Sequence, residues 1–218
     1  MRTRTVASTT IATVAAAIAS LGIAGSATAA HDDNPSSKVG TYTYTLAPVQ
    51  ADSVPNSQGW GSTRITALPN GKVQVQVRAS GLAPGLPHAM HLHGETDMPD
   101  MGCPGPAADG GDGIVSVVDG LPSYGGILAS LTTTGDTTAA SALALDRYPV
   151  ADATGRISYT RTFVDEQAWA NADTVQVVVH GIDINGNGAY DFEAGPSSLT
   201  SAAPLEATIP ALCGGIAN

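Results

Sequence analysis

The sequence predicts an all-β fold, an antiparallel barrel or sandwich built as one domain with long loops rich in glycine and aspartate. Two observations carry this prediction: stretches of alternating apolar and polar residues recur along the chain, and 25 glycines and 14 prolines provide turns between them. Of the 218 residues, 43% are hydrophobic, which is enough for one sizeable core. Helical patterns are scarce, and residues 164–172 predict only one or two turns.

Residues 1–30 have the features of a secretory signal peptide. Arg2 and Arg4 precede a long apolar stretch, and "SATAA" at 26–30 offers small residues at cleavage spacing, with the cut expected within 29–31. A membrane anchor is the alternative, but a stretch so rich in Ala, Thr and Ser transfers poorly into lipid. We therefore predict a secreted, extracellular protein with no membrane partner after cleavage. The polar residues 31–40 predict a flexible lead-in, and residues 41–218 form the β domain.

The strand signals follow in order along this domain. "TYTYTL" (41–46) alternates β-branched and aromatic residues, and two alternating stretches flank "PNG" (69–71), which is typical of a hairpin. Further strands are predicted within 88–94, 155–163 and 174–181. Residues 102–126 consist mostly of Gly, Pro, Asp and Ala, so we expect a long functional loop there, either ordered or mobile.

Charge and cysteine content limit the partners and the compartment. Loss of Arg2 and Arg4 with the signal peptide changes the net charge from −10 to −12, and such a surface repels nucleic acid while it attracts cations. We therefore predict no nucleic-acid partner, and the sequence does not identify a protein partner. The two cysteines of an exported chain, Cys103 and Cys213, are expected to form a disulfide.

The histidines suggest a metal site. On a strand, His91 and His93 project from one face and His88 from the other. A third imidazole would have to come from His180 or from His31, which signal cleavage would leave at or next to the new N-terminus in the flexible lead-in. Three imidazoles suit copper or zinc. The alternative is a pair of hydrogen-bonded histidines without a metal ion.

Four segments, in order, resemble the copper/zinc superoxide dismutase family: "VQVQVRASGLAPGLPHAMHLHG" followed by a cysteine, "DRYPVADATGRISYTRTF", "VVVHG" and "ALCGGIAN". This resemblance implies a Greek-key β-barrel with an intrasubunit Cys103–Cys213 disulfide. It also implies that His91, His93 and His180 are copper ligands. His88 would lie behind the site, where it bonds backbone groups and braces the strand.

The departures from that family concern zinc and catalysis. Residues 102–146 contain no histidine that could hold zinc, and Leu143 stands three positions before Asp146, where the family has a zinc ligand. Pro210 stands where the family has the arginine that guides superoxide to copper. We therefore expect no zinc site. Whether the protein is an enzyme is left open; if it is one, the resemblance implies a superoxide dismutase.

A second resemblance is consistent with these losses. "GLPHAMHLHG", "SYGGILASLTTTGD" and "VVVHGIDINGNGAYD" resemble secreted bacterial proteins with a chordin-type (CHRD) domain, which is itself similar to the dismutase barrel. Three functions follow as hypotheses. The first is a module that binds one metal ion, copper favoured, through three histidines; the second is a copper-only superoxide dismutase; the third is a metal-free structural or interaction module.

The segment "DINGNGAYD" resembles the first part of an EF-hand calcium loop. Oxygen-bearing side chains alternate at Asp183, Asn185 and Asn187, and Asp191 follows a glycine. The twelfth position of the loop is Ala194 instead of a bidentate glutamate, so any calcium binding would be weak. The alternative is a polar turn in which Asn and Asp favour the backbone geometry.

Overall fold

The structure, a computed structural model, describes residues 38–95 and 101–215. The predicted signal peptide (1–30) and residues 31–37 of the predicted lead-in lie outside the described residues. The strands begin at Gly40, so the last residue of that predicted lead-in already belongs to the sheet. Among the described helices, none is long and apolar enough to cross a membrane.

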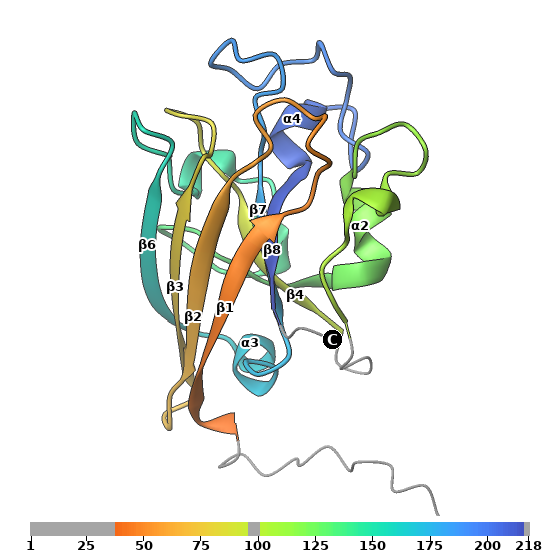
Figure 1. Ribbon diagram of the computed structural model, residues 1–218. Helices are drawn as coiled ribbons and strands as arrows, with labels where there is room; N and C mark the ends of the chain where they lie inside the picture. The colour runs from red at the N-terminus through yellow and green to blue at the C-terminus, as the bar shows by residue number, and fades with distance from the viewer. Residues whose placement is uncertain (1–37, 96–100, 216–218) are drawn as a thin grey trace, which may run out of the picture. The chain divides into compact units, whose positions relative to one another are not determined.

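Within the described residues, eight antiparallel strands form the body of the domain (Figure 1). The strands are β1 (Gly40–Pro48), β2 (Trp60–Ala67), β3 (Lys72–Ser80), β4 (Met90–Gly94), β5 (Gly126–Ser130), β6 (Ile157–Val164), β7 (Gln176–His180) and β8 (Pro210–Gly214). The helices are α2 (Val117–Tyr124), α3 (Glu166–Ala170) and α4 (Leu205–Thr208), with 3-10 turns η1 (Pro106–Ala108), η2 (Ala139–Ser141) and η3 (Leu145–Arg147). The predicted all-β class is confirmed, and α3 is the short helix expected within 164–172.

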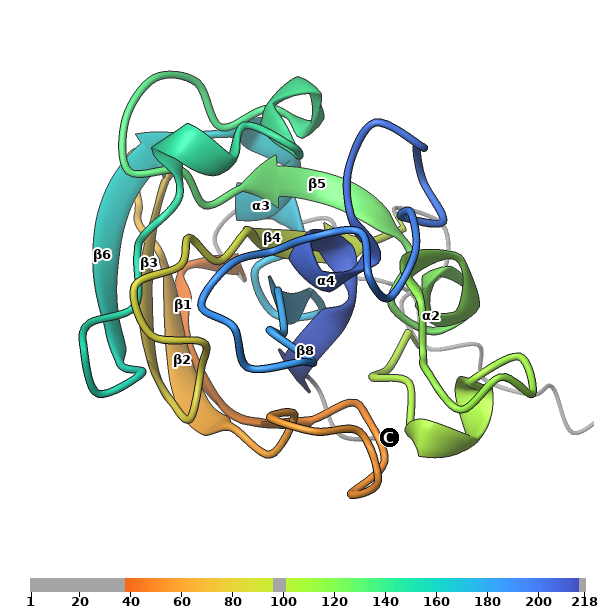
Figure 2. The same cartoon turned by 90° about the horizontal axis from the view of Figure 1, so that it is seen from above.

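The strand order is β5-β4-β7-β8-β1-β2-β3-β6. The connections from β3 to β4 and from β6 to β7 each join strands that are not neighbours, which gives the Greek-key topology. Figure 2 shows how strongly the sheet curves around the core. Its two edges are linked by side chains, since Tyr159 and Arg161 of β6 both donate to the carbonyl of Thr132, just after β5.

The β2–β3 hairpin shows how the sequence pattern produces the sheet. Val73, Val75 and Val77 are fully buried, and the polar residues between them face outward. The turn between the strands is closed by hydrogen bonds from Leu68 to Lys72 and from Gly71 to Leu68. Gly71 takes a left-handed φ of 74°, a conformation in which glycine carries no steric penalty.

Strands β4, β7 and β8 are buried on both faces. Met90, Leu92, Val177 and Val179 pack into the main core inside the barrel. The opposite face is covered as well: Val178 of β7 and Cys213 of β8 pack there with Val49, Val115 and Tyr124, the last of these from α2. Loops and the helix α2, and not a second sheet, therefore shield the side chains on this outer face from water.

Residues 102–126 all lie within the described part of the chain, and they contain a helix that the sequence pattern did not predict. Ser116 caps α2: its hydroxyl accepts from the Asp119 amide, and the Asp119 carboxylate accepts from the Ser116 amide. The sequence pattern does not predict this helix, because Gly120 and Pro122 lie within it and both residues are unfavourable in helix interiors. Gly120 is required locally, since a Cβ there would overlap the Tyr124 ring.

The predicted disulfide is confirmed. Cys103 and Cys213 are bonded across 110 positions of sequence, with their Cα atoms 5.7 Å apart. Cys213 lies in β8 opposite Val178 of β7, and Cys103 lies in the segment that leads into α2. The bond therefore ties the covering segment to the sheet, and the buried Gln176 side chain adds a hydrogen bond to the Met101 carbonyl of 2.9 Å.

We predict that the Cys103→Ser/Cys213→Ser protein loses about 4–5 kcal/mol of unfolding free energy, because closing a loop of this length restricts the unfolded chain by about that amount. Urea denaturation of this variant and of the oxidised parent measures the difference. The parent treated with reductant is the matched control and should agree with the variant. A loss below about 1 kcal/mol would contradict the prediction.

Candidate metal centre

Strand register brings three histidines to one face. His91 and His93 are two residues apart on β4, and β4 pairs with β7 so that Met90 faces Val179 and His91 faces Val178. The next step of this register places His180 beside Ala89, and the His180 amide donates to the Ala89 carbonyl at 2.8 Å. Since alternate residues share a face, His180 projects on the same side as His91 and His93.

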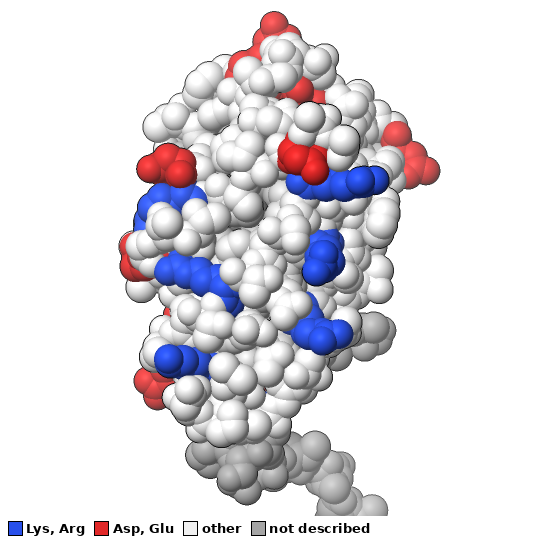
Figure 3. Space-filling view, turned by 90° about the vertical axis from the view of Figure 1, so that its left-hand side faces the viewer, with Lys and Arg blue, Asp and Glu red and all other residues white. Residues whose placement is uncertain are grey.

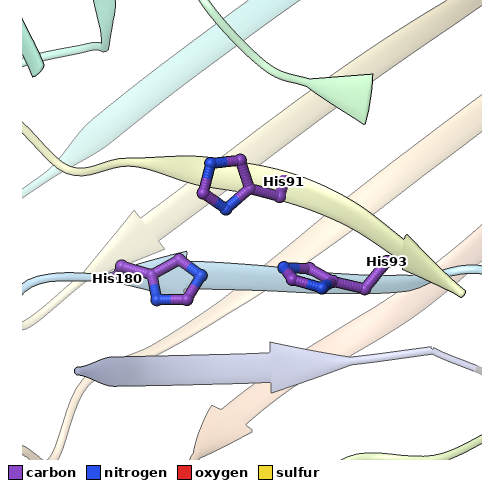
Figure 4. Close-up of side chains that lie close together, drawn as sticks. All are labelled: His91, His93 and His180. Carbon is purple, nitrogen blue, oxygen red and sulfur yellow. The ribbon is translucent and has the colours of Figure 1, made fainter. Parts of the chain in front are cut away.

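The three rings gather at one point on this covered outer face (Figure 4). Their centroids are 5.4 Å apart for His91 and His93, 5.0 Å for His91 and His180, and 5.9 Å for His93 and His180. The three histidine residues are 2–4% exposed. One ligand nitrogen from each lies within 4.8 Å of the other two, and within the described residues this is the only such convergence of His, Cys, Asp or Glu. Nitrogens that share one ion at about 2.0–2.1 Å lie roughly 3.3–3.6 Å apart, so the rings would move towards one another on binding where their separation is near the 4.8 Å limit.

One nitrogen of each ring has no protein partner. These atoms are Nδ1 of His91, Nε2 of His93 and Nε2 of His180, and all three are buried without a hydrogen bond. A buried polar atom without a partner costs about 1–3 kcal/mol, so one in each of three neighbouring rings calls for an explanation.

The opposite nitrogens of His93 and His180 are held by backbone carbonyls. Nδ1 of His93 donates to Gly125 at 2.9 Å, and Nδ1 of His180 donates to Thr208 at 2.7 Å. A carbonyl only accepts, so the proton resides on Nδ1 in both rings. The lone pair of each neutral ring is therefore on Nε2, directed to the common point. Outer hydrogen bonds of this kind orient the imidazole ligands of metal sites.

His91 has the reverse arrangement. Its Nε2 lies 2.9 Å from the Tyr148 hydroxyl and 3.2 Å from the Ala142 carbonyl. Tyr148 donates its own proton to the Ser141 carbonyl at 3.1 Å, so its oxygen accepts from His91. Burial raises the pKa of Tyr148 to about 12, so the phenol keeps its proton at neutral pH. The His91 lone pair is therefore on Nδ1, the atom that faces the other two rings.

Burial also keeps the three imidazoles neutral. It lowers the pKa of His180 to about 4, and burial together with the neighbouring His180 lowers the pKa of His93 to about 3. The pKa of His91 is far below its ordinary value, first because of burial and then because of the two other rings. Near pH 7 the three lone pairs can thus bind a cation without prior loss of a proton.

The rings line a cavity of about 30 Å³ whose other walls are mainly apolar: Ala89, Val117, Ile127, Ala142, Leu143, Leu199, Ala207 and Thr208. Leu143 and Leu199 are about half exposed, so these two leucine side chains form the part of the wall that faces solvent. No carboxylate or cationic side chain belongs to these described walls. The protein therefore offers three nitrogen ligands and an otherwise dry space.

His88 lies on the opposite face, as its position in the alternation predicts. It is fully buried, with Nδ1 at 3.0 Å from the His180 carbonyl and Nε2 at 3.2 Å from the Ala83 carbonyl. These contacts brace the backbone on which His180 is carried. Gly181 follows with a φ of 102°, and a Cβ there would overlap the Tyr190 hydroxyl. His31 lies outside the described residues.

The four predicted calcium ligands form a hydrogen-bonded turn. The Asp183 carboxylate accepts from the amides of Gly186 and Gly188, and the amide side chains of Asn185 and Asn187 donate to Asp191. These contacts are typical of the polar-turn alternative, and the calcium prediction gains no support from them.

Sequence reasoning missed Glu206, a fully buried residue of α4 that accepts from the amides of Ile184, Asn185 and Asp191. Its carboxylate accepts hydrogen bonds from three backbone amides of the turn and so stabilises the turn's conformation. No sequence pattern predicts this role, because the partner atoms are backbone amides.

Comparison with known proteins finds distant likeness in structure only. The crystal structure of the clock protein EA4 is 17% identical with a TM-score of 0.39, over 79% of this chain and 92% of that chain. The copper(II) form of Candida albicans superoxide dismutase 5 is 17% identical with a TM-score of 0.35, over 79% of this chain and 89% of that chain. No protein-family model and no curated protein matches the chain.

We predict that the metal-free protein loses stability as the pH falls from about 6.5 towards 4. In the unfolded chain these histidines titrate near 6.5, and in the folded chain the pKa values are lowered, so below 6.5 the unfolded state binds more protons. Each histidine then contributes a slope of up to about 1.4 kcal/mol per pH unit. Urea denaturation with chelator present, at about pH 7, 6 and 5, measures the unfolding free energy at each pH.

The His93→Asn protein is the matched control, since it has one titrating ring fewer and should lose stability less steeply. Both proteins carry the same carboxylates, so the difference in slope between them comes from the substituted ring. A stability that is flat between pH 7 and 5 would show that these rings are not buried in the neutral form.

Proposed function

We propose that the protein is an exported β-barrel that binds one copper ion through Nδ1 of His91, Nε2 of His93 and Nε2 of His180. The observation that carries this proposal is the set of three buried nitrogens without a partner, each in a ring whose other nitrogen is held by a hydrogen bond. A cation at their common point would use all three lone pairs, and no protein donor among the described residues does so.

The donor set favours copper over other ions. Imidazole nitrogens suit copper and zinc and not magnesium or calcium, which prefer oxygen. A zinc ion with three protein ligands takes water or substrate as its fourth ligand, and the mainly apolar walls offer such a ligand little to bond. Copper(II) also stands above zinc in affinity for a given nitrogen site. Bound copper would supply a one-electron redox couple; the residues of the chain hold, orient and shield it.

Binding is supported better than turnover of superoxide. An anion that approached the rings would meet Leu143 and Leu199, and no lysine or arginine lines the described cavity to attract it. The negative net charge of the chain opposes its approach further. A metal-free interaction module is supported less well, because it would leave three buried nitrogens without partners.

We also propose that the protein is exported to an oxidising compartment. A disulfide that spans 110 positions forms and persists in an oxidising compartment, which agrees with the signal peptide expected from the sequence. Mass determination of the secreted protein would test it, with cleavage expected within 29–31.

We predict one copper per chain after equilibrium dialysis and elemental analysis, and a copper affinity that falls more than about 100-fold in His93→Asn and in His180→Asn. Asparagine can keep the hydrogen bond to the carbonyl that Nδ1 of the histidine makes, but it lacks Nε2. Outer partners alone are worth about 10–100-fold, so loss of a ligand exceeds that range.

Urea denaturation of the metal-free variants shows whether each one is folded. Copper-free parent protein, or equal copper affinity in the parent and both folded variants, would overturn the proposal. A parallel zinc titration tests the choice of ion: tighter binding of zinc than of copper would retain the site and refute copper.

We predict that Tyr148→Phe weakens copper binding by about tenfold while one copper per chain is still bound, since the ring of His91 loses one of the two partners that orient it. Competition with a coloured chelator measures the affinity. Tyr159→Phe is the matched control: its hydroxyl donates to the Thr132 carbonyl and does not touch the three rings, so its affinity should equal that of the parent. Equal affinities in Tyr148→Phe and the parent would contradict the orienting role.

A further inference from the structure

The outward face of β1, β2, β3 and β6 differs in charge from the rest of the chain. These four strands contain no aspartate or glutamate, although the chain has 19 acidic residues. Arg64, Lys72 and Arg78 occupy exposed positions on β2 and β3, and Arg156 directly precedes β6. Figure 3 shows the cations across this face and most of the acidic residues near its edges. In a protein of net negative charge, this grouping needs a reason.

The register places small hydroxyl groups next to one of these cations. Arg78 of β3 lies between Ser62 of β2 and Ser158 of β6, and Trp60 lies opposite Ser80. Side chains at directly opposite positions of antiparallel strands are about 5 Å apart at Cβ. The arrangement therefore combines a guanidinium, several hydroxyls and an indole at one end of the face.

A groove of about 390 Å³ opens there, lined among others by Trp60, Ser62, Arg78, Ser80, Arg156 and Ser158. Trp60 is 67% exposed, which is unusual for so large an apolar ring. Asp152 also belongs to the lining; the Thr154 hydroxyl and the amides of Thr154 and Arg156 donate to its carboxylate and lower its pKa, so its negative charge partly offsets the neighbouring cations. Arg78 and Arg156 form no ion pair within the part of the chain that the structure describes.

We propose that this groove and the adjoining cations bind an acidic polysaccharide, a chain of sugar rings that bear carboxylate or sulfate groups. The guanidinium groups of Arg78 and Arg156 match such anions with two parallel hydrogen bonds each. The serine hydroxyls suit sugar hydroxyls, and the exposed Trp60 ring offers an apolar face to the C–H side of a sugar ring. Arg64 and Lys72 extend the positive track along the sheet for a longer chain.

Two other partners fit the same face less well. Single-stranded nucleic acid is bound by successive aromatic platforms, whereas Trp60 is a single ring in this groove. An acidic surface of a second copy would match the charge but would leave the Trp60 ring without an apolar partner. Both are outcomes that the experiment can detect.

The test measures binding of polygalacturonate, dextran sulfate and neutral dextran to metal-free protein by calorimetry or affinity electrophoresis. We expect polygalacturonate, dextran sulfate or both to bind and to weaken as salt is raised, and dextran not to bind. Arg78→Gln and Arg156→Gln should each weaken binding by about tenfold, in proportion to the loss of a charge-assisted hydrogen bond. Trp60→Ala should weaken it by about three- to tenfold.

The matched control is Ser201→Glu. It changes the net charge by the same amount as Arg78→Gln, but Ser201 precedes α4, which both ribbon views place away from β3 and β6 (Figures 1 and 2). Its affinity should stay within about twofold of the parent, as should that of the copper-site variant His93→Asn. The second comparison separates a failure of this proposal from a failure of the copper proposal.

Any of four binding results would overturn the proposal. These are no binding of either acidic polymer, equal binding of dextran, unchanged affinity in the Arg78→Gln and Arg156→Gln proteins, or tighter binding of a single-stranded DNA of matched charge. Self-association of the parent that disappears in Arg78→Gln would also overturn it, because it would identify a second copy as the partner.

Discussion

The structure around the three histidines is governed by one constraint: each ring nitrogen in a dry interior needs a partner. Three of the six nitrogens obtain one from separate segments, namely the carbonyl of Gly125 after α2, the carbonyl of Thr208 in α4 and the Tyr148 hydroxyl after η3. These partners decide where each proton resides. The other three nitrogens are thereby left as lone pairs that face one another.

The covering segments are in turn fastened to the sheet. The disulfide and the Gln176–Met101 hydrogen bond hold the segment that ends at Gly125. Arg147 pairs with Asp136 and contacts Ser141, which holds the loop that carries Ala142 and Tyr148. Arg161 binds the same loop through the carbonyls of Thr132 and Gly135. The geometry of the site therefore depends on polar contacts far from it, as well as on the strands that carry the ligands.

Sequence periodicity predicted the parts of this molecule that repeat. The alternation around Val75 predicted the β2–β3 hairpin, and the two-residue spacing of His91 and His93 predicted their common face. The resemblance to a known family, and not the pattern alone, selected His180 over His31. The strands β5 and β8 and the helix α2 were missed, because GILAS and PALCG show no clear alternation and a helix that contains both glycine and proline gives a weak pattern. The backbone carbonyls that orient the rings could not be predicted, since a carbonyl is present at every residue.

The burial of the three rings affects the rate at which a bound ion exchanges as well as the affinity with which it binds. The three histidines are 2–4% exposed, and Leu143 and Leu199 belong to the cavity wall, so an ion at their common point would have little contact with bulk water. Its exchange would depend on how often the surrounding segments open locally, as well as on the strength of the ligand bonds. Such an ion would leave more slowly than one held by exposed side chains of equal affinity.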